Sequence, residues 1–113
     1  MYQDQLEVIF NDSRIREVRL RLQSNPFEVF MKNYMESQHY KIGYRTQGVL
    51  DVKCPTKRVT NYVTYDYKCD CFGQERTGIP CCHLLCAAKS DTIPYIKLIN
   101  PRWLVDPDEP ALG

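Results

Sequence analysis

The spacing of apolar residues predicts a helix near the start of the chain. Ile15, Val18 and Leu22 recur at the interval of one helix face, which indicates a helix over 13–23. The same stretch also alternates from Val18 to Leu22, as a strand would. Its Leu, Arg and Glu residues favour the helix, and Ser13 is a suitable N-cap.

A second helix is expected directly after the first. Asn25, Pro26 and Glu28 have the order typical of a helix start, with Asn as the N-cap and Pro in the first turn. The helix should end near Ser37. Its apolar face would be formed by four residues: Phe27, Phe30, Met31 and Tyr34.

The pattern changes to that of strands after residue 40. Residues 49–54 have the pattern of a strand that stops at Pro55, and residues 59–67, which are rich in Val, Thr and Tyr, indicate a second strand. These two stretches should pair as an antiparallel hairpin around a basic turn. Residues 72–79 are expected to be a loop, and residues 83–89 have the composition of a short helix.

Length and composition place the chain among small globular domains. It has 113 residues, of which 43% are hydrophobic and 26% charged, and its longest apolar runs fall well short of the roughly 20 residues of a membrane helix. The first residues also lack the basic region and apolar core of a secretory signal. We therefore expect an intracellular protein that contacts no membrane.

The charges are unevenly distributed. The net charge is +1, but all 15 Lys and Arg residues lie within 13–105, where they outnumber the acidic residues, whereas 106–113 is acidic. A basic body of this kind suits an acidic partner such as a nucleic acid.

Cysteine is the most unusual feature of the composition. There are six cysteines, and five of them lie within 69–86 together with His83. Three disulfides are possible in principle, but the missing secretory signal indicates a reducing compartment. A clustered Cys/His set in such a compartment indicates a metal site.

The spacing Cys69-x-Cys71 and Cys81-x-His83 suits zinc. At the end of a strand, residues two apart point to one side. Pro80 can open a helix whose N-terminus favours the Cys81 thiolate. Three thiolates and one imidazole complete a tetrahedral site, so we predict one structural Zn²⁺. Cys82 or Cys86 could replace a ligand; otherwise these two and Cys54 should be small buried side chains.

These residues resemble a SWIM-type zinc finger. The lead-in Gly78-Ile79-Pro80-Cys81 and the following Arg102-Trp103 are similar to those of Mutator-like transposases and of plant transcription factors derived from them. The resemblance covers about 45–105, and Cys82 departs from it by adding a competing thiol. It implies a nuclear protein that binds DNA or other proteins. We expect a finger-bearing piece or a stand-alone relative without strand-transfer chemistry.

The predicted fold is a small zinc-stabilised α+β domain, with N-terminal helices packed on an antiparallel hairpin and a short helix that carries zinc ligands. Residues 1–40 would form the helical segment, 41–105 the zinc-finger domain and 106–113 a loose acidic tail.

DNA binding is the expected function. The predicted phosphate contacts are Lys53, Lys57, Arg58, Lys68 and Arg76. Tyr65, Tyr67 and Phe72 could stack on bases or pack the sheet. The alternative is a protein–protein adaptor that uses the apolar faces of the two N-terminal helices. We predict no catalytic residue and no small-molecule substrate, because a set of metal ligands leaves no single activated thiol.

Overall fold

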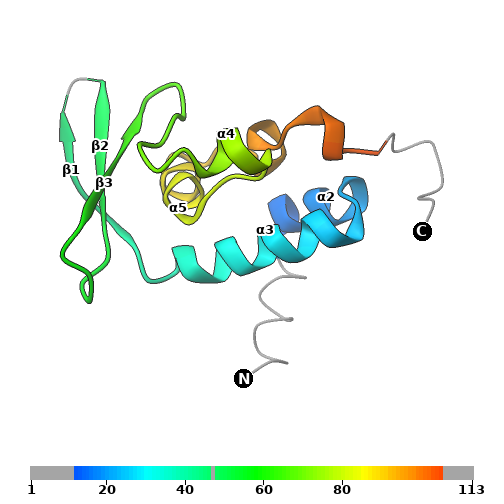
Figure 1. The fold of residues 1–113 in the computed structure, drawn as a ribbon, viewed down its shortest axis with the longest axis horizontal. Helices are drawn as coiled ribbons and strands as arrows, with labels where there is room; N and C mark the ends of the chain where they lie inside the picture. Colours follow the sequence, from blue (N-terminus) through cyan, green and yellow to red (C-terminus); the bar gives the residue numbers. More distant parts are fainter. Residues whose placement is uncertain (1–11, 47, 106–113) are drawn as a thin grey trace.

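Among the described residues, two helices precede a three-stranded sheet, and a second group of short helices follows it (Figure 1). The computed structural model describes residues 12–46 and 48–105, so the predicted acidic tail at 106–113 lies outside the described residues. The α+β class predicted from the sequence is confirmed. The elements are α2 Ser13–Arg21, α3 Ser24–Ser37, β1 Lys41–Thr46, β2 Val49–Lys53, β3 Thr60–Thr64, α4 Gly73–Thr77, α5 Cys82–Asp91, and the 3-10 helices η1 Tyr95–Leu98 and η2 Pro101–Trp103.

The two N-terminal helices lie where the apolar spacing predicts them, but their starts differ from the prediction. Asp12 caps α2 in place of Ser13, because its side chain accepts a hydrogen bond from the Arg14 N–H. In α3 the prediction of Asn25 as N-cap is wrong, since the helix begins at Ser24. Pro26 therefore lies within the first turn, where its missing N–H costs no hydrogen bond.

The three strands form one antiparallel sheet in the order β1-β2-β3. The predicted hairpin is β2 and β3, in which Leu50 pairs with Val63 and Asp51 with Tyr62. Strand β1 was not predicted, because Gly43 interrupts its pattern. The register of β1 also shifts between Ile42 and Arg45, as at a β-bulge, which disrupts the alternation of faces.

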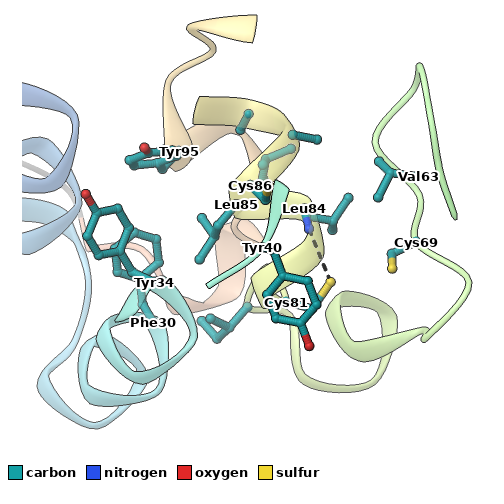
Figure 2. Close-up of a cluster of buried hydrophobic side chains, with 14 of the residues drawn as sticks. Phe30, Tyr34, Tyr40, Val63, Cys69, Cys81, Leu84, Leu85, Cys86 and Tyr95 are labelled. Carbon is teal, nitrogen blue, oxygen red and sulfur yellow. Dashed lines mark hydrogen bonds between the residues drawn. The ribbon is translucent and has the colours of Figure 1, made fainter. Parts of the chain in front are cut away.

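Helix α5 is the centre of the packing. It contacts α3 and all three strands, so it joins the N-terminal helices to the sheet. Figure 2 shows Leu85 on the side of Phe30 and Tyr34, and Leu84 on the side of Val63. Both leucines are completely buried, which stabilises the fold by about 1.5–3 kcal/mol per side chain. A helix that is apolar on nearly all sides is expected to be enclosed in this way.

Tyr95 fills the space between α2, α3 and α5. Its ring packs against Phe30 and Tyr34, with centroid distances of 6.0 and 5.9 Å, and the guanidinium of Arg14 lies 4.6 Å from its centre. The side chain is completely buried, yet its hydroxyl has no hydrogen-bond partner among the described residues. Burial is also the main cause that raises the pKa of Tyr95.

We expect Tyr95→Phe to leave the free energy of unfolding unchanged or to raise it by about 1 kcal/mol, because a buried unpaired hydroxyl is removed while the ring stays. Tyr67→Phe is the matched control. The Tyr67 hydroxyl donates to Asp91 at 2.7 Å, so its loss should cost about 1 kcal/mol. Urea unfolding of both variants checks this, and a Tyr95→Phe cost equal to that of Tyr67→Phe would contradict the packing described here.

Candidate metal centre

The first pair of cysteines lies on a segment that turns back along β3. The strand ends at Thr64, and Tyr67, with a φ of 62°, reverses the chain. Cys69 then bridges to Val63, so the prediction that a continuous strand delivers Cys69 and Cys71 is wrong. The left-handed conformation of Tyr67 is uncommon for a bulky residue, so the composition of 59–67 gave no sign of the turn.

Asp70 fixes this returning segment to the edge of β3. Its backbone N–H donates to the Tyr62 carbonyl at 3.1 Å, and its carboxylate accepts from the Tyr62 N–H at 3.1 Å and from the Asn61 amide at 3.0 Å. The edge of β3 is therefore occupied by the segment that carries Cys69 and Cys71.

The second pair, Cys81 and His83, lies at the start of α5. Helix α4 and Gly78 precede it; α4 was predicted as part of a loop, since a five-residue helix with glycine at each side has little local pattern. Cys81 is the N-cap of α5, and its sulfur accepts from the Leu84 N–H at 3.5 Å (Figure 2). The helix thus begins at Cys82, and the prediction that Pro80 opens it is wrong.

The two pairs converge on one point. The ligand atoms of Cys69, Cys71, Cys81 and His83 all lie within 4.8 Å of one another. The Cys69 sulfur is 3.4 Å from Nδ1 of His83. Three of the four residues are buried and Cys71 is half-buried. All six cysteines are free thiols, and Cys82 and Cys86 lie outside this group.

Burial and hydrogen bonds within the cluster shift the pKa values of three of its four residues. Hydrogen bonding with Cys69 lowers the pKa of Cys81, and the His83 ring and the Leu84 N–H act in the same direction. The pKa of Cys69 is raised by its hydrogen bond to Cys81 and by burial. Burial alone would lower the pKa of His83, but hydrogen bonds to Cys81 and Cys82 raise it. These directions favour a negative charge on the Cys81 sulfur and a positive charge on the His83 imidazole beside it.

The donor set fits a tetrahedral metal ion. Metal–sulfur bonds of about 2.3 Å in a tetrahedron place the sulfurs roughly 3.8 Å apart. The ligand atoms, within 4.8 Å of one another, are close to this spacing. Three thiolates and an imidazole can therefore coordinate one metal ion, which the four protein ligands would enclose without an open position.

Tyr40 supports the imidazole from outside the cluster. Its ring stands perpendicular to the His83 ring, with the centroids 5.0 Å apart. Lys57 lies 3.1 Å from the Tyr40 hydroxyl and 3.2 Å from the Glu36 carboxylate, and both contacts raise the pKa of Lys57. Sequence reasoning missed Tyr40, because nothing in the local pattern places it against His83.

We expect Tyr40→Leu to weaken metal binding about tenfold, since a group that orients a ligand is lost. Tyr40→Phe keeps the ring and should retain the affinity of the wild type. Competition with a chromophoric chelator measures both. Equal affinities for wild type and Tyr40→Leu would show that the imidazole needs no support from this ring.

The predicted phosphate contacts do not lie together. Lys53, Lys57 and Arg58 are at the end of the sheet that carries the β2–β3 turn, and Lys57 is held by Glu36. Lys68 follows the opposite end of β3, and Arg76 lies on α4, where its guanidinium donates to the Cys71 carbonyl at 3.4 Å.

The aromatic residues that the sequence suggested for stacking on bases differ in their contacts and exposure. The Tyr65 hydroxyl donates to the Thr46 carbonyl and the Tyr67 hydroxyl to Asp91, both at 2.7 Å. Phe72 is 58% exposed. Tyr62, which was not singled out from the sequence as a stacking residue, is 48% exposed.

Comparison of the chain with models of protein families, with curated proteins and with solved structures finds no match. Across 12–46 and 48–105, every helix is too short or too polar to cross a bilayer.

Proposed function

We propose that this chain is a SWIM-type zinc module that holds one structural Zn²⁺ and binds DNA within a transposase-derived nuclear protein. The observation that carries the proposal is the convergence of Cys69, Cys71, Cys81 and His83 on one point. Thiolate-rich four-ligand sets of this kind are typical of structural zinc.

Bound zinc would supply a cross-link between two parts of the fold. Cys69 and Cys71 belong to the segment on the edge of β3, whereas Cys81 and His83 belong to the start of α5. The ligands are far apart in the unfolded chain, so the free energy of zinc binding contributes directly to folding. No coordination position remains for a substrate, in agreement with a role without catalysis.

The elements of the SWIM resemblance that flank the ligands contact each other, which supports the proposal. The Asn100 N–H donates to the Gly78 carbonyl at 2.8 Å, and the Trp103 indole donates to the Thr77 carbonyl at 2.8 Å. The Arg102-Trp103 element therefore packs on the Gly78-Ile79-Pro80 lead-in to the ligands.

DNA is favoured over a protein partner because the apolar faces available for an adaptor are largely used in the core. Ile15, Val18, Phe30 and Tyr34 are buried within the described part of the chain. The excess of basic residues over 13–105 remains to be explained, and phosphate contacts account for it.

Fluorescence anisotropy with labelled DNA over a range of salt concentrations tests the function. We expect binding that weakens steeply between about 50 and 200 mM salt, because phosphate contacts release counterions. Absence of binding at low salt, or an affinity that is independent of salt, would contradict the proposal. Catalysis is tested separately, since we expect no strand cleavage of the DNA after prolonged incubation with Mg²⁺.

A further inference from the structure

Within 12–46 and 48–105, one face of the sheet is open to solvent. Leu50, Val52 and Val63 point toward α5 and are completely buried. Strand residues alternate between faces, so their neighbours point the other way. The register places Lys41, Lys53 and Thr60 in one row across this open face, with Asp51 and Tyr62 in the next.

The first row brings two like charges together. Lys41 and Lys53 are directly opposite each other in the register of β1 and β2, and both are exposed. The Lys53 side chain crosses toward β1, since its Cδ lies 3.4 Å from the point where a β-carbon would stand on Gly43. Neither lysine forms an ion pair with another described residue. Like charges in this position destabilise a sheet unless an anion lies between them.

An aromatic ring lies on the same face. Tyr62 is 48% exposed and lies one row from Lys53. Rows two residues apart along a strand are separated by about 6.6 Å. Paired cations beside an exposed ring are the combination that binds single-stranded nucleic acids, in which phosphates contact the cations and a base stacks on the ring.

We propose that this open face, formed by Lys41, Lys53, Thr60 and Tyr62, is where the chain binds nucleic acid, and that the strand is single at the point of contact. The proposal rests on the proposed function and deepens it by naming the surface. The two ammonium groups and the Thr60 hydroxyl contact the phosphate, and the Tyr62 ring stacks on the adjacent base. Asp51, beside Tyr62, keeps phosphates on the lysine row and accepts hydrogen bonds from base amino groups.

The other basic candidates suit phosphate less well. Lys57 is paired with Glu36 at 3.2 Å. Lys68 and Arg76 lie on a stretch that also contains Asp70 and Glu75, so that this stretch has no excess positive charge. Arg58, which is exposed at the turn beside Lys53, extends the positive potential of the open face.

The test uses the full zinc-loaded chain and a labelled single strand of about 12 nucleotides, within the range that small binding folds cover. We expect the double variant Lys41→Gln/Lys53→Gln to bind about tenfold more weakly at low salt and to lose about 1.4 from the slope of log K against log salt. Tyr62→Ala should weaken binding about tenfold without changing the slope. The control Lys32→Gln/Lys97→Gln removes the same charge from exposed positions on α3 and η1, and it should stay within about twofold.

The possible outcomes distinguish an error in the proposed binding surface from an error in the proposed DNA binding. If the control variant lost binding and the lysine-pair variant kept it, the assignment of the surface would be overturned, but the proposal of DNA binding would stand. Tighter binding of the matching duplex than of the single strand would overturn the single-strand proposal. A wild-type chain that binds neither would overturn the proposed function itself. Zinc content and circular dichroism of each variant establish that its fold is intact.

Discussion

A Cys81→Ser variant is expected to lose its metal and, with it, its folded structure at neutral pH. The sulfur is one of four atoms within 4.8 Å of one another, so its removal leaves the site with three ligands. Serine is itself a good helix N-cap, so the hydrogen bond that Cys81 accepts from Leu84 can be kept. Structural zinc contributes roughly 10–16 kcal/mol in small metal-dependent folds, as much as or more than the net stability of a domain.

Cys82→Ser is the matched control for this result. Cys82 is adjacent to Cys81 and undergoes the same chemical change, but it lies outside the group of four. We expect one metal ion per chain and a native circular dichroism spectrum in this variant. If Cys82→Ser lost the metal and Cys81→Ser kept it, Cys82 would be the ligand in place of Cys81. That result would contradict the geometry of the site.

Gly78→Ala is expected to destabilise the metal-loaded protein by about 2–3 kcal/mol. Gly78 ends α4 with a φ of 80°, in the left-handed region where a β-carbon costs about 1–2 kcal/mol. An added β-carbon would also stand 2.6 Å from the Trp103 indole nitrogen. The indole must then move and lose its bond to the Thr77 carbonyl, which costs about 1 kcal/mol more.

Gly48→Ala separates these two causes. Gly48 has a φ of 90°, but a β-carbon there meets no atom of the described residues within 4 Å, so only the backbone strain applies. Urea unfolding should therefore show a smaller loss for Gly48→Ala than for Gly78→Ala. Equal losses would mean that the contact between Gly78 and Trp103 contributes nothing to stability.

The Cys/His cluster is the part of the structure that the sequence predicts best. Its four residues occur in two short motifs, and each motif fixes two of them within three residues. Helices α2 and α3 were also predicted from apolar periodicity and α5 from its composition, because both are local signals. Their starts were wrong by one or two residues, since capping by Asp12 and Cys81 depends on side-chain geometry.

Features that depend on distant contacts could not be predicted. Strand β1 exists because it pairs with β2, although Gly43 and the register shift give it a poor strand pattern. The turn at Tyr67, which returns Cys69 to the edge of β3, is held by pairing with Val63. Likewise Tyr40 and Lys57 meet near His83 only because α3, the hairpin and α5 pack together.

Zinc content is the measurement that tests the central claim most directly. Elemental analysis of reduced, natively purified protein should give about one zinc per chain, and a strong chelator should abolish the folded circular dichroism spectrum, which returns when zinc is added. Protein that contains no zinc, and whose spectrum a strong chelator leaves unchanged, would contradict the account.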